Sequence, residues 1–153
     1  MQCSCHAGKI GIFCRLYRKS RQGLFRGSAA VCHPGADLML QEKEIPAEVI
    51  QNSRMFHFGA LSMTREPARQ ATKKAIRIAE EAGCICSFDP NLWPSLWNSM
   101  EEAKAQVVWG LQHCQILKIS DNELEWLTGT DDYDWGADRI RSRFRIPLVL
   151  VSM

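Results

Sequence analysis

Two short polar segments of this chain carry side chains that could do chemistry. The first is Asp89-Pro90-Asn91, where a carboxylate and an amide lie close together and could bind sugar hydroxyls or an ion. The same three residues are typical of an Asp-Pro turn, in which the carboxylate only accepts a hydrogen bond from the backbone. The spacing alone leaves both interpretations open.

The second segment is Ser120-x-x-Glu123, and Lys118 lies two residues before it. A carboxylate at the mouth of a sheet could hold magnesium through the waters of the ion. The same spacing is also a capping box, in which the two side chains satisfy the backbone at the start of a helix. Lys118 could meet a phosphate if its side chain points inward, because a buried lysine needs a partner or a task. Pointing outward, it would be an ordinary surface lysine.

Apolar runs precede these segments and predict the strands that would position them. We predict four strands, at residues 55–59, 84–88, 115–119 and 147–151. A small polar loop from Gly59 to Ser62 follows the first strand, Asp89 follows the second, and Ser120 follows the third.

Helical patterns lie between the predicted strands. Alanines at three- and four-residue spacing predict a helix with Thr64 as its N-cap, Ala82 on its apolar face and Gly83 as its stop. A capping-box pair begins the next helix, and the pattern predicts two further helices after it. Their positions are Ser99 with Glu102, residues 121–128 and residues 135–144.

The alternation of strands and helices predicts an α/β layer with a parallel sheet. Right-handed crossovers would place each connecting helix over one face of that sheet. Ligands of open α/β sheets bind at the carboxyl ends of the strands. We therefore expect Gly59, Asp89 and Ser120 at the same edge.

The composition is that of an ordinary globular protein. The 153 residues suffice for one domain with a core, and 46% hydrophobic against 24% charged residues argues against disorder. No apolar run reaches the about 18 residues of a membrane helix, and no signal segment is present, so we expect neither membrane insertion nor secretion. Seven scattered cysteines are not a disulfide framework and indicate a cytoplasmic protein.

The charge is unevenly distributed along the chain. Residues 1–36 contain six basic residues and no acid, whereas the remaining chain has a balance of −4. Such an asymmetry can indicate a nucleic-acid-binding arm or a targeting peptide. Because the basic residues form no helical stripe, we expect no nucleic-acid binding. We predict an irregular, protease-sensitive segment at 1–32 and a domain at 33–153.

Four segments of the chain, in unbroken order, resemble the fructokinases of the ribokinase-like, or PfkB, sugar-kinase family. They are H-P-G-A-D-L-M-L at 33–40, F-H-F-G-A-L-S at 56–62, S-F-D-P-N-L-W at 87–93 and L-K-I-S-D-N-E-L-E-W-L-T-G at 117–129. The resemblance implies a Rossmann-like fold, present here in part, and ATP-dependent phosphorylation of a sugar hydroxyl. It further implies fructose as the sugar, magnesium as the cofactor and a homodimer for full-length members.

The resemblance also implies roles for single residues. Glu123 matches the glutamate that the family ties to magnesium and phosphate, and Ser120 occupies the neighbouring motif position. Asp89 and Asn91 match the segment beside the path of substrate and phosphate. The remaining matches are Gly59 and Ser62, in the loop after the first strand, and Lys118, a recurrent lysine.

The chain departs from the family in several respects, two of which bear directly on catalysis. Trp93 stands where the family has an arginine, so a positive group near the phosphate is missing. The G-A-G-D segment, which supplies the base and an anion-holding loop in the family, does not occur. Gly35-Ala36-Asp37 and Gly136-Ala137-Asp138 lack its second glycine. We therefore expect a partial sugar kinase that is inactive as this fragment; the alternative is a non-catalytic interaction or regulatory module on a kinase-derived fold.

Overall fold

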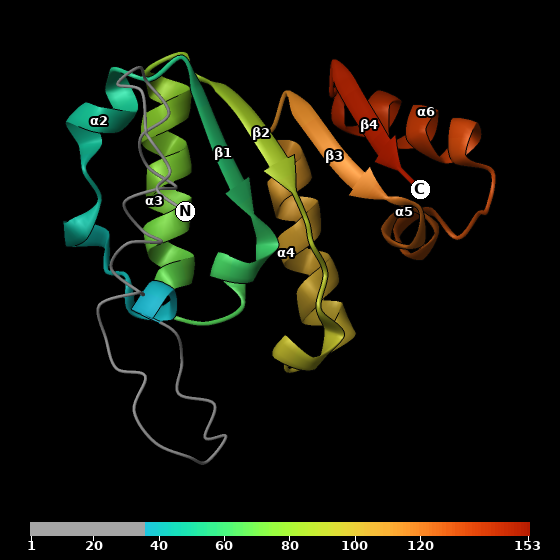
Figure 1. Ribbon diagram of the computed structural model, residues 1–153, viewed down its shortest axis with the longest axis horizontal. Coiled ribbons are helices and arrows are strands. Elements are labelled where there is room, and N and C mark those ends of the chain that lie inside the picture. Colours follow the sequence, from blue (N-terminus) through green and yellow to red (C-terminus); the bar gives the residue numbers. More distant parts are fainter. Residues whose placement is uncertain (1–35) are drawn as a thin grey trace, which may run out of the picture.

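The computed structural model describes residues 36–153, so the predicted irregular segment 1–32 lies outside the described residues. Four parallel strands form one sheet in the order β1-β2-β3-β4 (Figure 1). Their bounds are Met55–Gly59, Ile85–Asp89, Ile116–Ser120 and Leu148–Ser152. The predicted α/β fold with a parallel sheet is confirmed, and each strand lies within one residue of its predicted place.

Helices connect the strands and precede the first one. The α-helices are α2 at Ala47–Gln51, α3 at Ala68–Glu81, α4 at Met100–Gln112, α5 at Asp121–Thr128 and α6 at Tyr133–Phe144. Short 3-10 turns lie at Ala36–Met39 (η1), Glu42–Glu44 (η2), Ala60–Met63 (η3) and Pro94–Leu96 (η4). Within residues 36–153, no helix combines the length and the apolar character that crossing a membrane requires.

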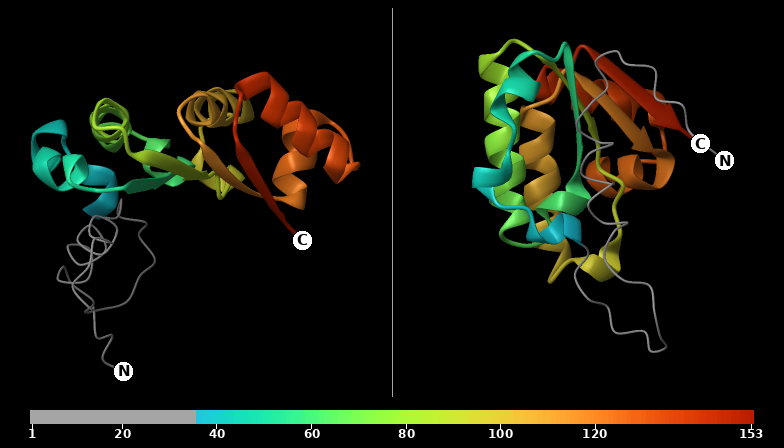
Figure 2. Two further views of the ribbon diagram at one scale, coloured as in Figure 1. Left: turned by 90° about the horizontal axis from the view of Figure 1, so that it is seen from above. Right: turned by 60° about the vertical axis from the view of Figure 1, so that its left-hand side comes forward.

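The crossover helices lie on one face of the sheet. Successive strands are added in one direction, and right-handed crossovers then place every connecting helix on the same side. Figure 2 shows α3, α4 and α6 on that side. We call the opposite side the open face. At alternate strand positions it carries Met55 and His57, Ile85, Ser87 and Asp89, Ile116 and Lys118, and Leu148 and Leu150.

The core fills the space between the sheet and the helices. Phe58 and Phe88 are almost fully buried, with stacked rings whose centroids are 4.7 Å apart. Gly110 allows α4 to approach β2, because a Cβ at this position would lie 2.6 Å from the Phe88 ring. Burial of a phenylalanine of this kind is worth about 1.5–3 kcal/mol. The packing thus fixes both the strands and the loops that follow them.

The ends of α3 differ from the sequence prediction. Thr64 is not its N-cap; it closes η3, where its hydroxyl donates to the Leu61 carbonyl at 2.8 Å. The helix begins at Ala68, after Pro67, and Ala82 is its exposed C-cap residue rather than part of the apolar face. The spacing of alanines could not reveal that residues 60–63 form a separate turn.

The ladder between β2 and β3 is shorter than the other two. Five residue pairs join β1 to β2 and five join β3 to β4, but only Ser87–Ile116 and Phe88–Leu117 join β2 to β3. Next to these two pairs, the side chain of Gln115 takes the place of a backbone partner in the ladder. The Cys86 N–H donates to the Gln115 side-chain oxygen at 2.8 Å, and the Gln115 N–H donates to the Cys86 carbonyl at 2.8 Å.

Candidate functional site

The carboxyl ends of the strands bring the predicted segments to one edge of the sheet. Gly59 is the partner of Asp89 across the β1–β2 ladder, and Ser120 ends β3 next to them. The Ala60 N–H donates to the Pro90 carbonyl at 3.3 Å, so the loops after β1 and β2 are joined beyond the last ladder pair. The expectation of a common edge is confirmed.

Gly59 and Ser62 shape the loop after β1. A Cβ at Gly59 would lie 3.0 Å from the Asp89 carbonyl oxygen, so the two strands approach closely where they end. The Ser62 hydroxyl donates to the Gly59 carbonyl at 3.2 Å and closes the turn of η3. In this structure both residues support the backbone of the loop.

The loop after β2 turns sharply at Asn91. Its φ of 44° is in the left-handed region, which asparagine tolerates better than most residues. The Asn91 side-chain oxygen accepts a hydrogen bond from the Trp93 indole N–H at 3.2 Å, and both side chains are exposed. The indole therefore lies against the amide, at the position where the resemblance expects a positive charge.

Glu123 joins two loops through one carboxylate. Its Oε2 accepts hydrogen bonds from the Ser120 N–H at 3.0 Å and the Ser120 hydroxyl at 2.9 Å. This is the predicted capping box at the start of α5. Its Oε1 accepts the Leu92 N–H at 2.6 Å. The contact with Leu92 was not predicted, because the backbone N–H of a residue 31 positions away leaves no mark in the sequence.

Lys118 points outward, onto the open face. Its ammonium lies 2.9 Å from Asp89 Oδ2, and about half of its side chain is exposed. The hydrogen bond and the charge of Asp89, aided by Glu123, raise the pKa of Lys118 above its ordinary value. Asp89 is therefore the partner of a lysine, a pairing that follows from strand register and not from any motif.

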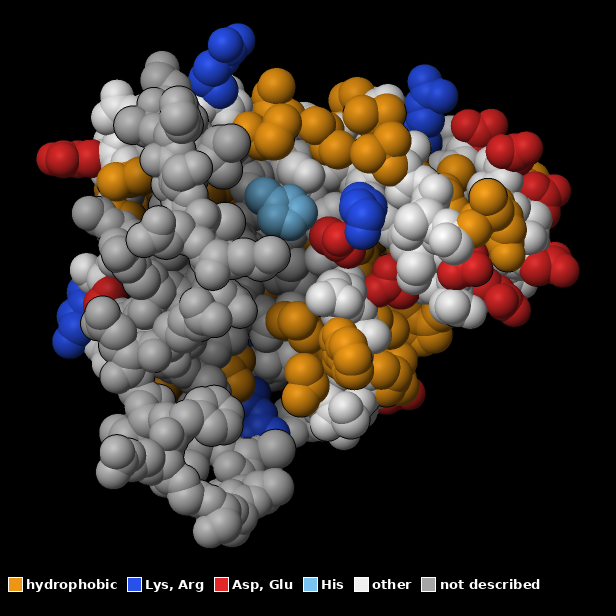
Figure 3. Space-filling model, viewed as in Figure 1, with side chains coloured by type: hydrophobic (Ala, Val, Ile, Leu, Met, Phe, Trp, Pro, Cys, Tyr) orange, Lys and Arg blue, Asp and Glu red, His pale blue; other side chains and the backbone are white. Residues whose placement is uncertain are grey.

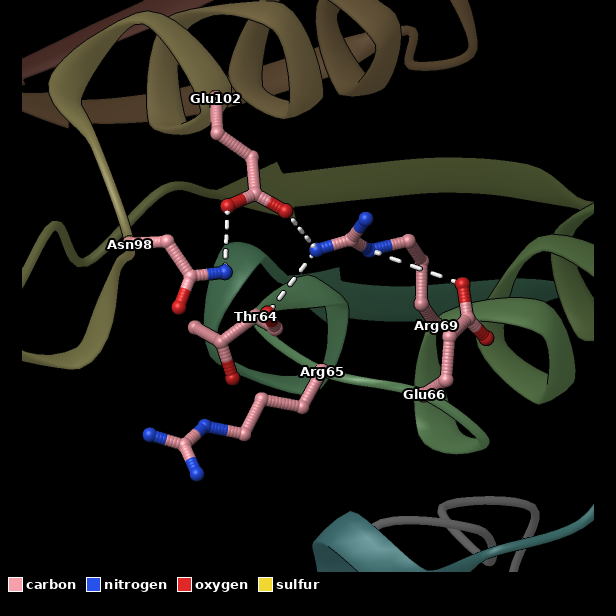
Figure 4. A pocket seen from close by; sticks show the side chains of 6 residues that line it. All are labelled: Thr64, Arg65, Glu66, Arg69, Asn98 and Glu102. Atoms are coloured by element: carbon pink, nitrogen blue, oxygen red, sulfur yellow. Dashed lines mark hydrogen bonds and ion pairs between the residues drawn. The ribbon is translucent and has the colours of Figure 1, made fainter.

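A second polar cluster lies beside this edge, where α3 and α4 begin (Figure 4). Arg69 donates to the Met63 and Thr64 carbonyls at 2.7 and 2.9 Å and forms an ion pair with Glu102. Glu102 also accepts a hydrogen bond from the Asn98 amide at 2.8 Å. These residues, with Arg65 and Glu66, line an open depression of about 330 Å³. The Nε and one terminal nitrogen of Arg69 bond to the loop before α3 and to Glu102 of α4. The cluster therefore acts as a brace between the two helices.

The thiols of Cys86 and Cys114 are not nucleophiles, and the described part of the chain contains no clustered metal site. Burial raises the pKa of both Cys86 and Cys114 to about 12, so their thiols stay protonated. Among residues 36–153, no three His, Cys, Asp or Glu side chains gather as a metal-binding group would. The segment Gly136-Ala137-Asp138 lies inside α6, which agrees with rejecting it as a catalytic loop.

The comparisons with known proteins point to one family. Residues 29–153 match the profile described as pfkB family carbohydrate kinase. Over 102 residues, the chain is 42% identical to a probable fructokinase-4 of Arabidopsis thaliana and to fructokinase-1 of Zea mays. Each match covers 67% of this chain, but only 31% and 32% of those relatives. The chain thus spans about a third of the length of the curated relatives it matches.

Solved structures give the same result. A fructokinase from Vibrio cholerae, determined with fructose, ADP and calcium, superimposes with a TM-score of 0.68 at 32% identity and covers 78% of this chain. A fructokinase from Xylella fastidiosa with bound ATP gives 0.67 at 28% identity and covers 80%. In each case 38% of the solved chain is matched. The family profile, which matches most of the chain, and the similarity to these solved fructokinases show that this chain belongs to the pfkB family of carbohydrate kinases.

Proposed function

We propose that this chain forms the phosphate-handling edge of a fructokinase-like sugar kinase, whose reaction is the ATP-dependent phosphorylation of fructose or a related sugar. The curated relatives are named fructokinases, and the solved relatives hold fructose, ADP or ATP. The family match from residue 29 onward supports a kinase domain at 33–153.

One observation carries this proposal. Glu123 joins the start of α5 to the loop after β2 through its bonds to Ser120 and to the Leu92 N–H. Phosphoryl transfer depends on positioning and on stabilising negative charge more than on covalent chemistry. A carboxylate that fixes two strand-end loops relative to each other provides positioning of this kind.

Magnesium fits this site through water. A carboxylate has about four lone-pair sites, and three hydrogen bonds already occupy Glu123. About one site remains, on Oε1, which suits a water of a hydrated magnesium ion better than direct coordination. Magnesium, when bound with ATP, would supply charge neutralisation at the phosphates. Glu123 and Ser120 are the residues of this chain that would hold its waters.

The remaining predicted residues would shape the phosphate path. Lys118 points outward and is held by Asp89, so its place on the phosphate path is supported by the resemblance alone. Trp93 already bonds to the oxygen of the Asn91 amide, so the nitrogen is the group of this side chain that would donate to a phosphate near the same edge. Gly59 and Ser62 keep the first loop close to the second.

We further propose that the 153-residue chain does not catalyse the reaction by itself. It contains no G-A-G-D segment, to which the resemblance assigns the base and the anion-holding loop. A general base typically contributes about 10²–10⁴ in rate, and one charge-stabilising donor about 10²–10³. Without the base and the anion-holding loop, no measurable rate of fructose phosphorylation should remain.

A coupled assay of ADP release, with fructose, ATP and magnesium, tests the activity. We expect no fructose-dependent rate from the pure chain. A fructose-dependent rate that is lost in Glu123→Ala would show that the chain is a working kinase.

Ligand-induced stabilisation tests the site independently of activity. A ligand that binds the folded chain raises its free energy of unfolding. We expect ATP with magnesium to raise the unfolding midpoint of the chain and of Glu125→Ala, an exposed residue of the same helix. The rise should be smaller in Glu123→Ala, relative to its own midpoint without ligand. An equal rise in all three proteins would reject Glu123 as part of the site.

A further inference from the structure

Helix α6 carries its acidic and basic side chains in two separate halves. The first half and the residues just before it hold exposed aspartates, whereas the second half and the C-cap hold exposed arginines. These residues are Asp131, Asp132, Asp134 and Asp138, followed by Arg139, Arg141, Arg143 and Arg145. Figure 3 shows acidic side chains gathered on the right-hand margin of the molecule, where Figure 1 draws α5, α6 and the loop between them. The charge reverses at the middle of the helix, between Asp138 and Arg139.

An exposed tryptophan lies on the solvent side of the same helix. Trp135 is 47% exposed, and the Arg139 guanidinium lies 4.8 Å from the centroid of its ring. Together with Asp138 and Ser142, these two residues line an open depression of about 390 Å³. The core contact of α6 is made by Ile140, which is 3% exposed. Trp135 therefore contributes little to the core and is available for contact with another molecule.

The charge pattern of α6 is complementary to itself. A two-fold axis brings the same patch of two copies together, and it is the commonest symmetry of protein dimers. If the axis passes beside the middle of α6 and the two helices run antiparallel, the acidic half of each helix lies against the basic half of the other. Trp135 is then level with Ser142 of the second copy, a small residue that leaves room for the indole. A parallel arrangement would instead bring the aspartates of the two copies together, which is unfavourable.

The spacing along α6 also places opposite charges on the same flank of this contact. Asp134 and Arg141 are seven residues apart, which is about two helical turns, so their side chains share one flank. The two-fold axis keeps this flank on the same side in both copies. Asp134 of each copy thus faces Arg141 of the other. Within its own chain, Arg141 has only a long ion pair to Asp138, at 3.9 Å, and both side chains are highly exposed.

We propose that α6 is a surface through which two copies of this chain associate, with the helices antiparallel and Trp135 at the contact. The occupant is a second copy because one helix carries both halves of the complementary charge pattern. Exposed charges are screened by salt, so the association is strongest at low ionic strength. The inference rests on α6 alone and depends neither on the proposed kinase reaction nor on the missing segments of the family.

An exchange of charges tests the proposal. Sedimentation equilibrium of the pure chain at low salt should show a monomer–dimer equilibrium. Asp134→Arg and Arg141→Asp should each raise the dissociation constant of the dimer at least about tenfold, because each change sets like charges opposite each other at both symmetric contacts. An equimolar mixture of the two variants should associate again, to within about threefold of the unmodified chain, because opposite charges then face each other at both contacts.

Two further variants make the test specific to α6. Trp135→Ala should also weaken association, whereas Arg77→Asp, the same chemical change at an exposed arginine of α3, should leave it unchanged. Circular dichroism checks that each variant is folded, and Asp134→Asn and Arg141→Gln replace any charge reversal that is not. A chain that stays monomeric at low salt and high concentration would overturn the proposal. So would a dimer that the α6 variants leave intact, or two weakened variants whose mixture does not associate.

Discussion

At the scale of single residues, the side chains of the candidate site bond to backbone groups and to one another across neighbouring loops. Glu123 accepts three hydrogen bonds from two loops. The Ser62 hydroxyl donates to the Gly59 carbonyl, and the Asn91 side-chain oxygen accepts the Trp93 indole N–H. Of the two interpretations of Ser120-x-x-Glu123 considered from the sequence, the structure confirms the capping box, and the water-mediated ion stays a prediction. The capping box is present, and it leaves room for a water-mediated ion.

Glu123→Gln tests the strength of this connection. Glutamine has one acceptor oxygen in place of two, so the Leu92 N–H or the Ser120 groups lose their partner. A hydrogen bond to a charged group contributes about 1.5–3 kcal/mol, and we expect a loss in this range in the free energy of unfolding, measured with urea. Glu125→Gln, on the exposed side of α5, should change it by less than about 0.5 kcal/mol. Equal values for the two variants would contradict this account.

At the scale of elements, α4 packs closely on β2 at Gly110. Alanine favours helices over glycine by about 1 kcal/mol, so an unhindered Gly→Ala change in a helix should stabilise the protein. At Gly110 the new Cβ would lie 2.6 Å from the Phe88 ring, whereas at Gly136 its nearest neighbour is at 3.3 Å.

Gly110→Ala should therefore destabilise the protein by about 1–3 kcal/mol, since overpacking outweighs helix propensity. Gly136→Ala should be close to neutral. Thermal and urea unfolding of the two variants provide the comparison. A stabilised Gly110→Ala would mean that α4 can move away from β2 at little cost.

The brace between α3 and α4 predicts a dependence on pH. Hydrogen bonds from Arg69 and, next, from Asn98 hold the pKa of Glu102 below its ordinary value. A carboxyl of this kind contributes stability that is fully present above its unfolded pKa of about 4.3 and is lost as the pH falls through its folded pKa.

Urea midpoints measured from neutral pH down to about pH 3 should fall less steeply in Glu102→Gln than in the unmodified chain. Glu81→Gln, at the exposed end of α3, should retain the original slope. If Glu102→Gln keeps the full acid dependence, Arg69 and Glu102 do not stabilise the contact between the helices.

The sequence predicted strands better than contacts. Apolar runs placed each strand within one residue because a buried strand is recorded in local residue types. The limits of α3 were less visible, since Thr64 is as suitable for ending a 3-10 turn as for starting a helix. The pairs Lys118–Asp89 and Arg69–Glu102 join residues 29 and 33 positions apart. Such pairs depend on strand register and helix packing, which residue spacing does not encode.

At the scale of the whole molecule, the proposed function gives the chain one edge of a kinase site. The arginine that the resemblance expects is Trp93 here, and its indole donates to Asn91. We expect Trp93→Arg to leave the chain without fructose-dependent ADP release, because the base expected from the resemblance does not occur in the 153 residues. A rate gained by this single change would show that the missing charge, and not the missing base, limits the chain.

The short junction between β2 and β3 divides the sheet into two mechanical units. When the ends of the sheet are pulled apart, five ladder pairs resist on either side, but two pairs and the Gln115 side chain resist at the centre. Force should therefore separate β1 and β2 from β3 and β4 before it breaks either pair. The carboxylate of Glu123 and the Lys118–Asp89 ion pair bridge this line at its carboxyl end. In a single-molecule pulling experiment, their removal should lower the first rupture force and leave the later ones unchanged.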